Sequence, residues 1–372
     1  MARKIRVLHI LPSIRGYGAE RQIVELLTRL PSPDIDVALL TIYEPDPEQR
    51  TGLPFPVFHA GRRGRKDLLF IGRLISAILR FNPDIVHTHT HVGKYWGRLA
   101  ACIARSAFIV HTEHNPCDVR RTHLERVADW ALIYATSKVV TFFPEQGASL
   151  REVEHLPQKK LAIIPNGLAL PETRSADRAA SRKLLGVPPG RFAILVVGRM
   201  EFQKNQSLAL RALASMREEL RKQVLMYFAG SGEDENLLRG LARALDVEER
   251  VRFLGYRNDV PKLLEGADLV LMTSWFEGMP LALLEAMIAG VPIVSTPWTG
   301  ARNMLGDGRF GFLSADYEAG RVAAEIDRAL SHPSARAQVA QHAQEHVYEK
   351  YGIGRMVDAH RALYTQLSKV AS

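Results

Sequence analysis

Short apolar runs alternate with amphipathic segments along the first half of the chain. The runs are rich in Val, Ile and Leu and have the length of buried strands, whereas the segments between them repeat apolar residues at i, i+3, i+4 and i+7, as one helix face does. The expected strands are 5–11, 37–43, 84–90, 108–114, 139–143 and 161–165, and the expected helices are 20–30, 67–81, 94–105 and 123–135. This alternation predicts a mostly parallel sheet with helices on both faces.

The alternation stops at 168–190, where prolines and charges replace the strand-like runs, and it begins again with FAILVVG at 192–198. Further strands are expected at 223–230, 250–255, 267–274 and 291–296, with helices at 206–220, 235–245, 259–265, 280–289, 316–331 and 335–350.

Two series of this kind predict an α/β protein with two doubly wound, Rossmann-like domains, 1–170 and 190–352. A C-terminal helix at about 353–370 is expected to cross back to the first domain. Because ligands of such sheets bind beyond the carboxyl ends of the strands, the cleft between the domains is the expected active site.

Composition places the chain among ordinary globular proteins and excludes disordered, collagen-like and disulfide-scaffold classes, with 47% apolar and 24% charged residues. The two cysteines, Cys102 and Cys117, lack the spacing of a zinc site and favour a reducing compartment. The first apolar run is broken by His9, Pro12 and Arg15, and no run has the length of a membrane span. We therefore expect a cytoplasmic protein that works free in the cytoplasm or at the inner face of the membrane.

Positive charge gathers in the first half. The whole chain carries +9, and residues 1–170 hold 23 Lys and Arg against 16 Asp and Glu, a net of +7. This asymmetry predicts an anionic surface or substrate. The basic run Arg62–Lys66 is a candidate for contact with anionic lipid, while the amphipathic segment after it is better explained by packing on the sheet. Nucleic acid is disfavoured, because basic stretches interleaved with aromatic residues are missing.

The strongest local motif is SWFEGMPLALLEAM at 274–287, which closes a strand and opens a helix. Pro280 suits a first helical turn, and Gly278 with the following N–H groups forms a helix N-terminus that favours an anion. Glu285 lies in an apolar passage, where a pair of ligand hydroxyls such as a ribose diol would satisfy its oxygens; the alternative is pairing with a neighbouring Arg or Lys.

A second motif, GRMEFQKN at 198–205, leaves the strand 192–198. Arg199 and Lys204 would point into the cleft, and a guanidinium with an ammonium a few residues away is suited to a diphosphate, both bound and as a leaving group. Ordinary surface charges explain this segment equally well.

Two further loops carry weaker signals. Gly16 and Gly18 follow the first strand, but Arg21 stands where the dinucleotide fingerprint needs a glycine. Backbone approach to a phosphate or sugar and an ordinary tight turn are equally good explanations of this loop. Asp34 and Asp36 resemble a metal-binding pair but are expected in a solvated loop before the strand 37–43.

Histidines gather at two strand ends. His87, His89 and His91 alternate and are expected on one face, and His111, Glu113 and His114 end the next strand. Zinc would need three or four of them in tetrahedral range. The better explanation is that one histidine contacts substrate and that its neighbours satisfy the others.

Together these motifs resemble the large family of retaining glycosyltransferases with the GT-B fold, number four in the usual sequence classification. The resemblance rests on 198–210, FAGSGED at 228–234, 250–260 and above all 274–296, where Glu277 and Glu285 fit the family's Glu, seven residues, Glu pattern. Further similar segments are YGAER (17–21), the HTH strand end, TEH (112–114) and IPNGL (164–168).

The resemblance implies metal-independent transfer of a sugar from a nucleotide donor, more often a UDP-sugar than a GDP-sugar, to a glycan or lipid-linked acceptor with retained configuration. It implies that no separate cofactor is needed. The implied site residues are Arg199 and Lys204 for the diphosphate, Glu285 for the ribose, Glu277 with Gly278, Met279, Pro280 and Leu281 for sugar and phosphate, Gly18 for the phosphate, His114 for the sugar near the reacting centre, and Tyr256 with Arg257 near the base.

Two other function classes remain open at this point. A sugar-nucleotide epimerase or hydrolase of similar fold would share the diphosphate site and need no acceptor. A non-catalytic nucleotide-sugar binding protein would not need the full set of basic and acidic residues. Synthesis of surface polysaccharide or glycolipid, with a peripheral contact to anionic membrane, is the expected setting for the transferase.

Overall fold

The computed structural model describes residues 3–14, 18–46, 48, 51–64, 66–115, 123–171 and 177–371. Contacts divide the chain into two compact units: the first is residues 1–167 with 353–372, and the second is residues 168–352. Each unit holds its own parallel sheet. The predicted fold class, two doubly wound α/β sheets, is therefore confirmed.

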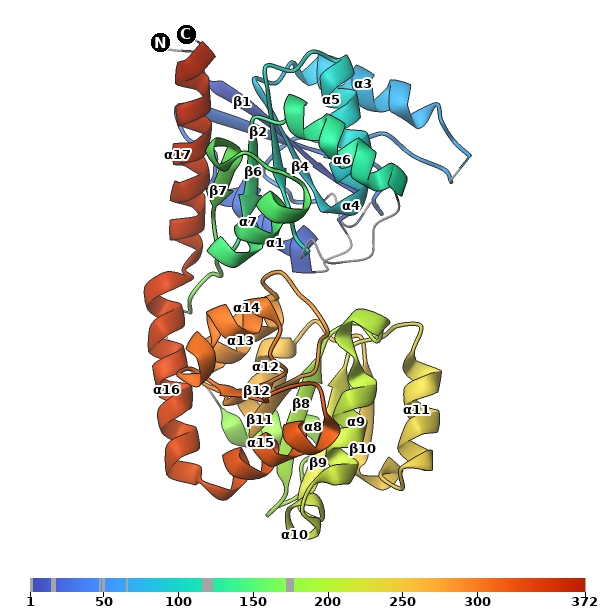
Figure 1. Ribbon diagram of the computed structural model, residues 1–372, viewed down its shortest axis with the longest axis vertical. Coiled ribbons are helices and arrows are strands. Elements are labelled where there is room, and N and C mark those ends of the chain that lie inside the picture. The colour runs from blue at the N-terminus through green and yellow to red at the C-terminus, as the bar shows by residue number, and fades with distance from the viewer. Residues whose placement is uncertain are drawn as a thin grey trace. The chain divides into compact units, whose positions relative to one another are not determined.

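The first unit is built on a seven-stranded sheet in the order β3-β2-β1-β4-β5-β6-β7 (Figure 1). All neighbouring strands pair in parallel. Its strands are β1 (Ile5–Leu11), β2 (Ile35–Thr41), β3 (Val57–His59), β4 (Ile85–His89), β5 (Phe108–Thr112), β6 (Lys138–Thr141) and β7 (Leu161–Ile163).

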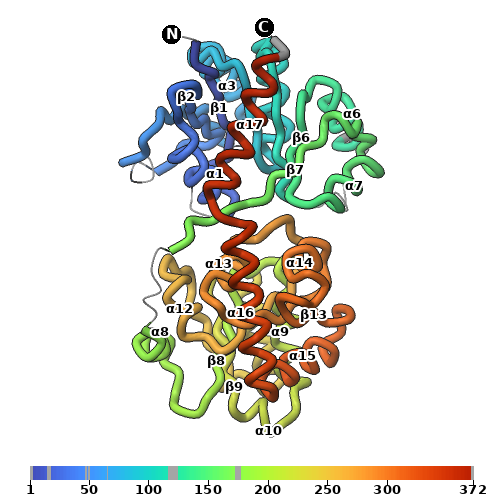
Figure 2. The backbone as a smooth tube through the Cα atoms, turned by 90° about the vertical axis from the view of Figure 1, so that its left-hand side faces the viewer, coloured from blue at the N-terminus to red at the C-terminus, as the bar shows by residue number. Residues whose placement is uncertain are grey.

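Helices cover both faces of this sheet because alternate strand residues point to opposite sides. In β1, Val7 and Leu11 join the core beneath α1 and α17, whereas Leu8 and Ile10 join the core beneath α3 and α5. The helices are α1 (Gly18–Arg29), α3 (Phe70–Phe81), α4 (Thr90–Val92), the π-helical turn η1 (Gly93–Gly97), α5 (Arg98–Ile103), α6 (His123–Ala135), α7 (Pro144–Val153), η2 (Gln158–Lys160) and α17 (Ile353–Ala371). The C-terminal helix α17 lies against α1 (Figure 2).

The second unit repeats the plan with six parallel strands in the order β10-β9-β8-β11-β12-β13. The strands are β8 (Phe192–Val197), β9 (Val224–Ala229), β10 (Val251–Gly255), β11 (Leu269–Met272), β12 (Ile293–Ser295) and β13 (Phe312–Leu313). The helices are α8 (Arg178–Leu185), η3 (Phe202–Lys204), α9 (Gln206–Ser215), α10 (Glu218–Arg221), α11 (Glu235–Ala244), η4 (Glu248–Arg250), α12 (Val260–Gly266), α13 (Leu281–Ala289), α14 (Thr299–Met304), η5 (Gly306–Gly308), α15 (Ala319–Ser331) and α16 (Pro333–Lys350).

Several local expectations were wrong. The second strand begins at Ile35, which pairs with Ile5, so Asp36 lies within a strand and not in a solvated loop. The expected helix 94–105 starts as the π-helical turn η1. The expected helix 206–220 breaks at Met216, whose extended backbone and burial end α9. The strand-like pattern stops in segment 168–190, as expected, and the structure adds the helix α8 there, capped by the Asp177 side chain.

The described residues include no helix long and apolar enough to cross a membrane.

Candidate active site

In the second unit, the loops after β8 and β11 bring a lysine and a glutamate together. Lys204 Nζ lies 2.6 and 2.8 Å from the two carboxylate oxygens of Glu277. Ser274 Oγ donates a third hydrogen bond, at 2.6 Å, to Glu277 Oε1. Glu277 is 7% exposed, so its charge is compensated by the ammonium and the hydroxyl and not by water. The resemblance implied separate ligand contacts for Lys204 and Glu277; the structure shows that they also bind each other.

Hydrogen bonds to backbone carbonyls fix these two loops against each other. The Trp275 N–H donates to the Gln203 carbonyl at 2.9 Å, and the Gln203 side-chain amide donates to the Phe276 carbonyl at 3.0 Å. Thr273 Oγ1 donates to the Lys204 carbonyl at 3.1 Å. These bonds hold the lysine and glutamate in one geometry, as a preorganised site requires.

Arg199 lies on the same loop but at the surface. Its side chain is 53% exposed and lies 2.8 Å from Glu201. Burial raises the pKa of Glu201, while the nearby Arg199 and Lys204 charges oppose that rise. The guanidinium and the Lys204 ammonium therefore belong to one loop, one at its surface and one in its interior.

Glycines allow the loops after β8 and β9 to pack backbone against backbone. A Cβ on Gly230 would lie 2.0 Å from the Gly198 carbonyl, and a Cβ on Gly232 would lie 2.1 Å from the Met200 carbonyl. Gly230 also has a φ of +155°, which side chains rarely adopt. The glycines of FAGSGED are thus explained by close packing beside Arg199.

Helix α13 begins directly after the Glu277 loop. Pro280 is its N-cap with an extended backbone, so the proline precedes the first turn and does not lie in it. Gly278, Met279 and Leu281 are buried. Glu285 is half-buried one turn into the helix, among apolar neighbours. This places the N-terminus of α13, which has no side-chain cap from its N-cap residue Pro280, and two carboxylates after the end of β11.

Tyr256 and Arg257 follow β10. The Tyr256 side chain is exposed, whereas the Arg257 guanidinium donates to both oxygens of Asp259 at 2.8 and 2.6 Å. These bonds raise the pKa of Arg257 and lower that of Asp259. A stacking surface is available at Tyr256, while the Arg257 guanidinium already has a carboxylate partner.

Gly18 and His114 belong to the first unit. Gly18 is exposed at the start of α1, and the Ser13 hydroxyl at the end of β1 donates to Glu20 in that first turn. Arg15, Gly16 and Tyr17 of the glycine loop lie outside the described residues, as does Cys117.

His114 ends a continuous line of hydrogen-bonded side chains, which we call the histidine row. Its consecutive partners are 2.8, 2.6, 3.1, 2.9 and 3.3 Å apart. In order, the row consists of Thr112, His87, Tyr364, His9, His89 and His114. It joins β5, β4, β1 and α17 on one face of the sheet.

The row is buried and uncharged. Burial holds the pKa of His9, His87 and His89 well below the ordinary value, and neighbouring histidines lower it further. Burial also lowers the pKa of His114 to about 4, with Glu113 opposing that change. Neutral imidazoles are therefore present at physiological pH.

The expectation that His87, His89 and His91 lie on one face of a strand was wrong for His91. The strand ends at His89, and Thr90 turns the chain with a φ of 59°, a strained value for a β-branched residue. His91 is exposed in α4, 3.4 Å from Glu125. The expectation that neighbours satisfy most of these histidines is confirmed for His87 and His89.

The opposite face of the same strands carries a charged cluster. Lys94 Nζ lies 2.7 Å from Glu113, 3.2 Å from Asp129 and 3.0 Å from Glu154, and Arg98 lies 3.4 Å from Asp129. The lysine side chain is 3% exposed. Although burial raises the pKa of Glu113, Lys94 and His111 lower it well below its ordinary value. We call Lys94, Arg98, Glu113, Asp129 and Glu154 the charged cluster.

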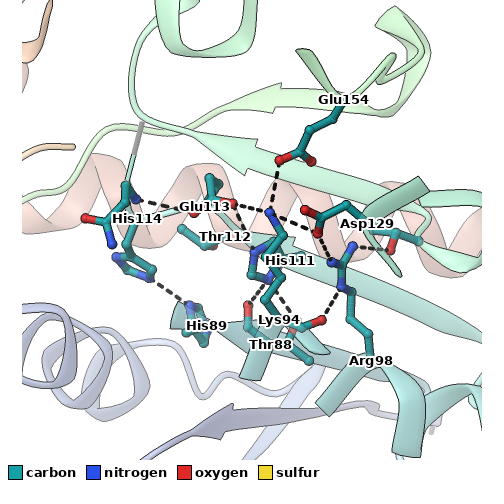
Figure 3. A network of polar contacts seen from close by, with 12 residues as sticks. Thr88, His89, Lys94, Arg98, His111, Thr112, Glu113, His114, Asp129 and Glu154 are labelled. Atoms are coloured by element: carbon teal, nitrogen blue, oxygen red, sulfur yellow. Dashed lines mark hydrogen bonds and ion pairs between the residues drawn. The ribbon is translucent and has the colours of Figure 1, made fainter. Parts of the chain in front are cut away.

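Figure 3 shows the charged cluster and the end of the histidine row meeting at adjacent residues. Glu113 belongs to the cluster and His114 to the row. His111 lies with the cluster, with its Nδ1 3.0 Å from Thr88 Oγ1. The backbone step from Glu113 to His114 is thus held from both faces of the sheet.

Three histidines of the row also meet the distance requirement for a metal site. One ring nitrogen from each of His9, His87 and His89 lies within 4.8 Å of the others. Every ring nitrogen of these three already has a hydrogen-bond partner in the row. Hydrogen bonds within the row therefore explain this set without a cation. His111 and Glu113 lie on one face of the sheet and His114 joins the row on the other, so these three residues do not form a zinc site together.

Sequence reasoning missed the residues that support His114. His9 interrupts the apolar strand IRVLHIL, and a polar residue inside such a run is a usable signal. Tyr364 lies 355 residues from His9 along the chain, and no local pattern connects them. Lys94 and Asp129 fall within the expected helices 94–105 and 123–135, and no motif in the sequence connects them.

Two family models match the chain. The model described as Glycosyl transferases group 1 matches residues 177–346, and the model described as Glycosyltransferase Family 4 matches residues 17–170. The chain is 27% identical over 326 residues to the Escherichia coli UDP-Gal:alpha-D-GlcNAc-diphosphoundecaprenol alpha-1,3-galactosyltransferase, covering 83% of this chain and 84% of that one. It is 26% identical over 386 residues to a Streptomyces avermitilis D-inositol 3-phosphate glycosyltransferase, covering 94% and 82%.

Solved structures share the fold. Anabaena HepE in complex with UDP and glucose matches with a TM-score of 0.82 at 22% identity, over 98% of this chain and 100% of that one. WaaG, described as a glycosyltransferase involved in lipopolysaccharide biosynthesis, matches with a TM-score of 0.78 at 19% identity, over 96% and 99%.

The two parallel sheets and these matches define a glycosyltransferase of the GT-B class. Within that class the chain belongs to glycosyltransferase family 4, the group 1 glycosyltransferases. It is therefore a retaining enzyme that takes its sugar from a nucleotide donor, and the epimerase, hydrolase and non-catalytic alternatives give way to a transferase.

Proposed function

We propose that this enzyme transfers a sugar from a UDP-sugar to a hydroxyl of a glycan or lipid-linked acceptor in the synthesis of surface polysaccharide or glycolipid, without a metal ion. The observation that carries the donor site is the buried Lys204–Glu277 pair beside the N-terminus of α13, with Arg199 on the same loop. The E. coli relative is named for a UDP-Gal donor and a diphosphoundecaprenol-linked acceptor, which supports both choices.

The proposed diphosphate contacts follow from the hydrogen-bonding capacity of the site. A lysine ammonium has three N–H donors, and the two bonds to Glu277 leave one for a phosphate oxygen. Arg199 adds a second positive charge from the same loop, and the N–H groups at the start of α13 add a third positive region. Charge that develops on the leaving diphosphate is then neutralised by the protein itself.

We assign the remaining donor contacts to the residues that the family resemblance implies. Glu285 binds the ribose hydroxyls, Tyr256 lies beside the base, and Glu277 with Gly278–Leu281 binds sugar and phosphate. From the first unit, Gly18 brings backbone to the phosphate. His114, a neutral imidazole, gives a hydrogen bond to the donor sugar near the reacting carbon.

Retention follows from attack on the same face as departure. The bond from the anomeric carbon to the phosphate oxygen breaks, the bond to the acceptor oxygen forms, and the leaving phosphate oxygen takes the acceptor's proton. No protein nucleophile is required by this balance.

The donor proposal is tested by thermal shift of the purified enzyme with UDP, GDP or ADP in the presence of EDTA, since a ligand bound by the native state raises its melting temperature. We expect UDP to stabilise the enzyme, and Arg199→Ala and Glu285→Ala to lose this shift while remaining folded. Arg321→Ala, which removes an exposed guanidinium far along the sequence, is the matched control. A shift with GDP or ADP alone, or one that needs added metal, contradicts the proposal.

The proposed membrane contact rests on the α3, α5 and α6 side of the first unit (Figure 1). The buried face of α3 packs on the sheet, as expected, but large apolar side chains on these helices and just before α3 remain exposed. Leu68 and Leu69 follow the basic residues Arg63 and Lys66 in sequence, and the others are Ile103, Trp130 and Tyr134. Apolar groups flanked by cations suit an anionic lipid surface.

Vesicle sedimentation tests this contact. We expect binding to phosphatidylglycerol vesicles that weakens with salt, and little binding to phosphatidylcholine. The variant Arg63→Ala, Lys66→Ala, Leu68→Ser, Leu69→Ser should lose it, and the control variant Arg243→Ala, Arg321→Ala, Leu184→Ser, Leu237→Ser in the second unit should retain it. Equal binding to both vesicles, or an unaffected first variant, overturns the proposal.

A further inference from the structure

The histidine row has a property that its separate hydrogen bonds do not have, because it is continuous. A neutral imidazole has one N–H donor and one acceptor nitrogen. Each ring in the row uses both nitrogens within it, except His114 at the end. A ring that accepts from one neighbour must therefore donate to the next, so all bonds of the row point in one direction.

The Tyr364 hydroxyl in the middle of the row also accepts from one neighbour and donates to the other. Tyr364 has a single O–H proton and can donate to His9 or to His87, but not to both. Its burial raises its pKa well above the ordinary value, so the hydroxyl keeps its proton. If Tyr364 accepted from both histidines, its buried O–H proton would have no acceptor in the row, which costs free energy. In the satisfied arrangements Tyr364 therefore accepts on one side and donates on the other.

Thr112 determines which of the two directions leaves no buried hydrogen-bond donor without an acceptor. Its hydroxyl is buried, and among the described residues its hydrogen-bond partner is His87 Nε2. If Thr112 accepted from His87, its own O–H proton would be buried without an acceptor, which costs free energy. When Thr112 donates instead, every bond in the row is satisfied in sequence.

That direction assigns the proton of each ring. His87 Nε2 accepts from Thr112 and Nδ1–H donates to Tyr364, which donates to His9 Nε2. His9 Nδ1–H then donates to His89 Nε2, and His89 Nδ1–H donates to His114 Nε2. All four histidines carry the Nδ1–H form, and His114 is left with Nδ1–H as its outward donor.

We propose that Tyr364 of the C-terminal helix is a positioning residue that holds His114 in the Nδ1–H form through His9 and His89. The catalytic consequence rests on the proposed contact of His114 with the donor sugar, whereas the proton assignment does not. Tyr364 thus acts on His114 from the other end of the chain without touching substrate.

Histidine nitrogen NMR tests the assignment directly. In ¹⁵N-histidine-labelled enzyme, long-range ¹H–¹⁵N spectra distinguish a protonated ring nitrogen from an unprotonated one, and single His→Gln variants assign the signals. We expect His9, His87, His89 and His114 all to show protonated Nδ1 and unprotonated Nε2. A mixed pattern among the four, or a shared Nε2–H pattern, overturns the inference in the wild-type enzyme, where folding is not in question.

The variant Tyr364→Phe removes the bridging hydroxyl and little else. We expect the Nδ1 signal of His114 to lose its purely protonated character, because His9 Nε2 no longer accepts a hydrogen bond from Tyr364. Tyr227→Phe is the control, since Tyr227 is also buried but its hydroxyl lacks a hydrogen-bond partner among the described residues. A His114 spectrum that is the same in both variants contradicts the positioning role.

Kinetics separate this inference from the proposed function. If both hold, Tyr364→Phe lowers kcat by about fivefold with little change in KM for the UDP-sugar. A changed His114 spectrum with unchanged kcat keeps the proton assignment and contradicts the role of His114 in transfer. An unchanged spectrum contradicts the positioning role whatever the rate.

Discussion

At the scale of single residues, the proposed donor site contains a charge pair, Lys204 with Glu277, whose charges compensate each other within the protein. Lys204 and Glu277 are both largely buried, and each is the other's main ionic partner. A buried ion pair is costly to break from one side, because the remaining charge is left without compensation. Both residues are therefore expected to act as a unit.

The variant Glu277→Gln tests this unit. It keeps the size of the side chain but leaves the Lys204 ammonium without its carboxylate, so we expect kcat/KM for the UDP-sugar to fall at least about tenfold. Glu318→Gln, which removes an exposed carboxylate that pairs with Arg321 at 3.9 Å, should leave kcat/KM unchanged. Steady-state kinetics of both variants test this prediction. If Glu277→Gln and Glu318→Gln had the same kcat/KM, Glu277 would have no part in transfer.

A second prediction concerns the close approach of two loops. A Cβ on Gly300, in the first turn of α14, would lie 2.3 Å from the Gly278 carbonyl and 2.3 Å from the Trp298 ring. Gly300→Ala should displace the Gly278 backbone and raise KM for the donor. Gly240→Ala in α11 meets nothing within 4 Å and should be neutral or stabilise by about 0.5–1 kcal/mol. Donor titration and thermal melts of the two proteins provide the comparison.

At the scale of elements, the charged cluster explains why a π-helical turn replaces regular helix at Gly93–Gly97. Lys94 lies in this turn and reaches carboxylates from the end of β5, from α6 and from just after α7. Such wide turns are frequently found at functional sites. Here the turn places one ammonium among three carboxylates and ties three helices to the loop that carries His114.

Removing the Lys94 ammonium should lower the unfolding free energy strongly. Lys94→Met leaves Glu113, Asp129 and Glu154 with Arg98 as the remaining cation of the cluster, and we expect a loss of about 3–5 kcal/mol in unfolding free energy. Lys222→Met breaks an exposed pair whose side chains are 62% and 59% exposed, and should leave the unfolding free energy nearly unchanged. Urea denaturation of both variants measures the difference, and equal midpoints would refute the structural role of the cluster.

At the scale of the whole molecule, the buried histidines make the first unit sensitive to acid. Their folded pKa values are lowered, to about 4 for His111, His114 and His360, whereas unfolded histidines titrate near 6.5. Between these values the unfolded chain binds more protons than the folded one. The stabilisation is therefore complete above about pH 7 and is lost as the pH falls from about 6.5 toward 4.

We expect each such histidine to reduce the stability of the first unit by about 1 kcal/mol between pH 7.5 and 5.5. Hydrogen exchange of the β1 and β4 amides reports this unit by itself. His360→Gln should reduce the loss of stability between these pH values by the contribution of one histidine. His342→Gln, at an exposed position, should not change that loss. Protection factors, corrected for the pH dependence of intrinsic amide exchange, that are equal at both pH values would contradict the burial of neutral imidazoles.

The sequence predicted the fold class because the apolar strands of both sheets are distinct. It did not predict β3 and β13, which have three and two residues and too little pattern to recognise. Lys204 and Glu277 were both identified as candidate site residues, but their pairing depends on loop geometry that periodicity does not describe. The contact of Tyr364 with His9 depends on the path of the C-terminal helix, which no spacing along the chain contains.

The position of α17 also governs how the protein can be made. The first unit includes β1 near residue 5 and α17 from residue 353 on, so a ribosome releases all of the second unit before it supplies the last helix of the first. Until then the apolar face of β1 lacks Met356, Val357, Leu363 and Tyr364. Nascent chains therefore carry a folded second unit beside an incomplete first one, an exposed surface of the kind that chaperones bind.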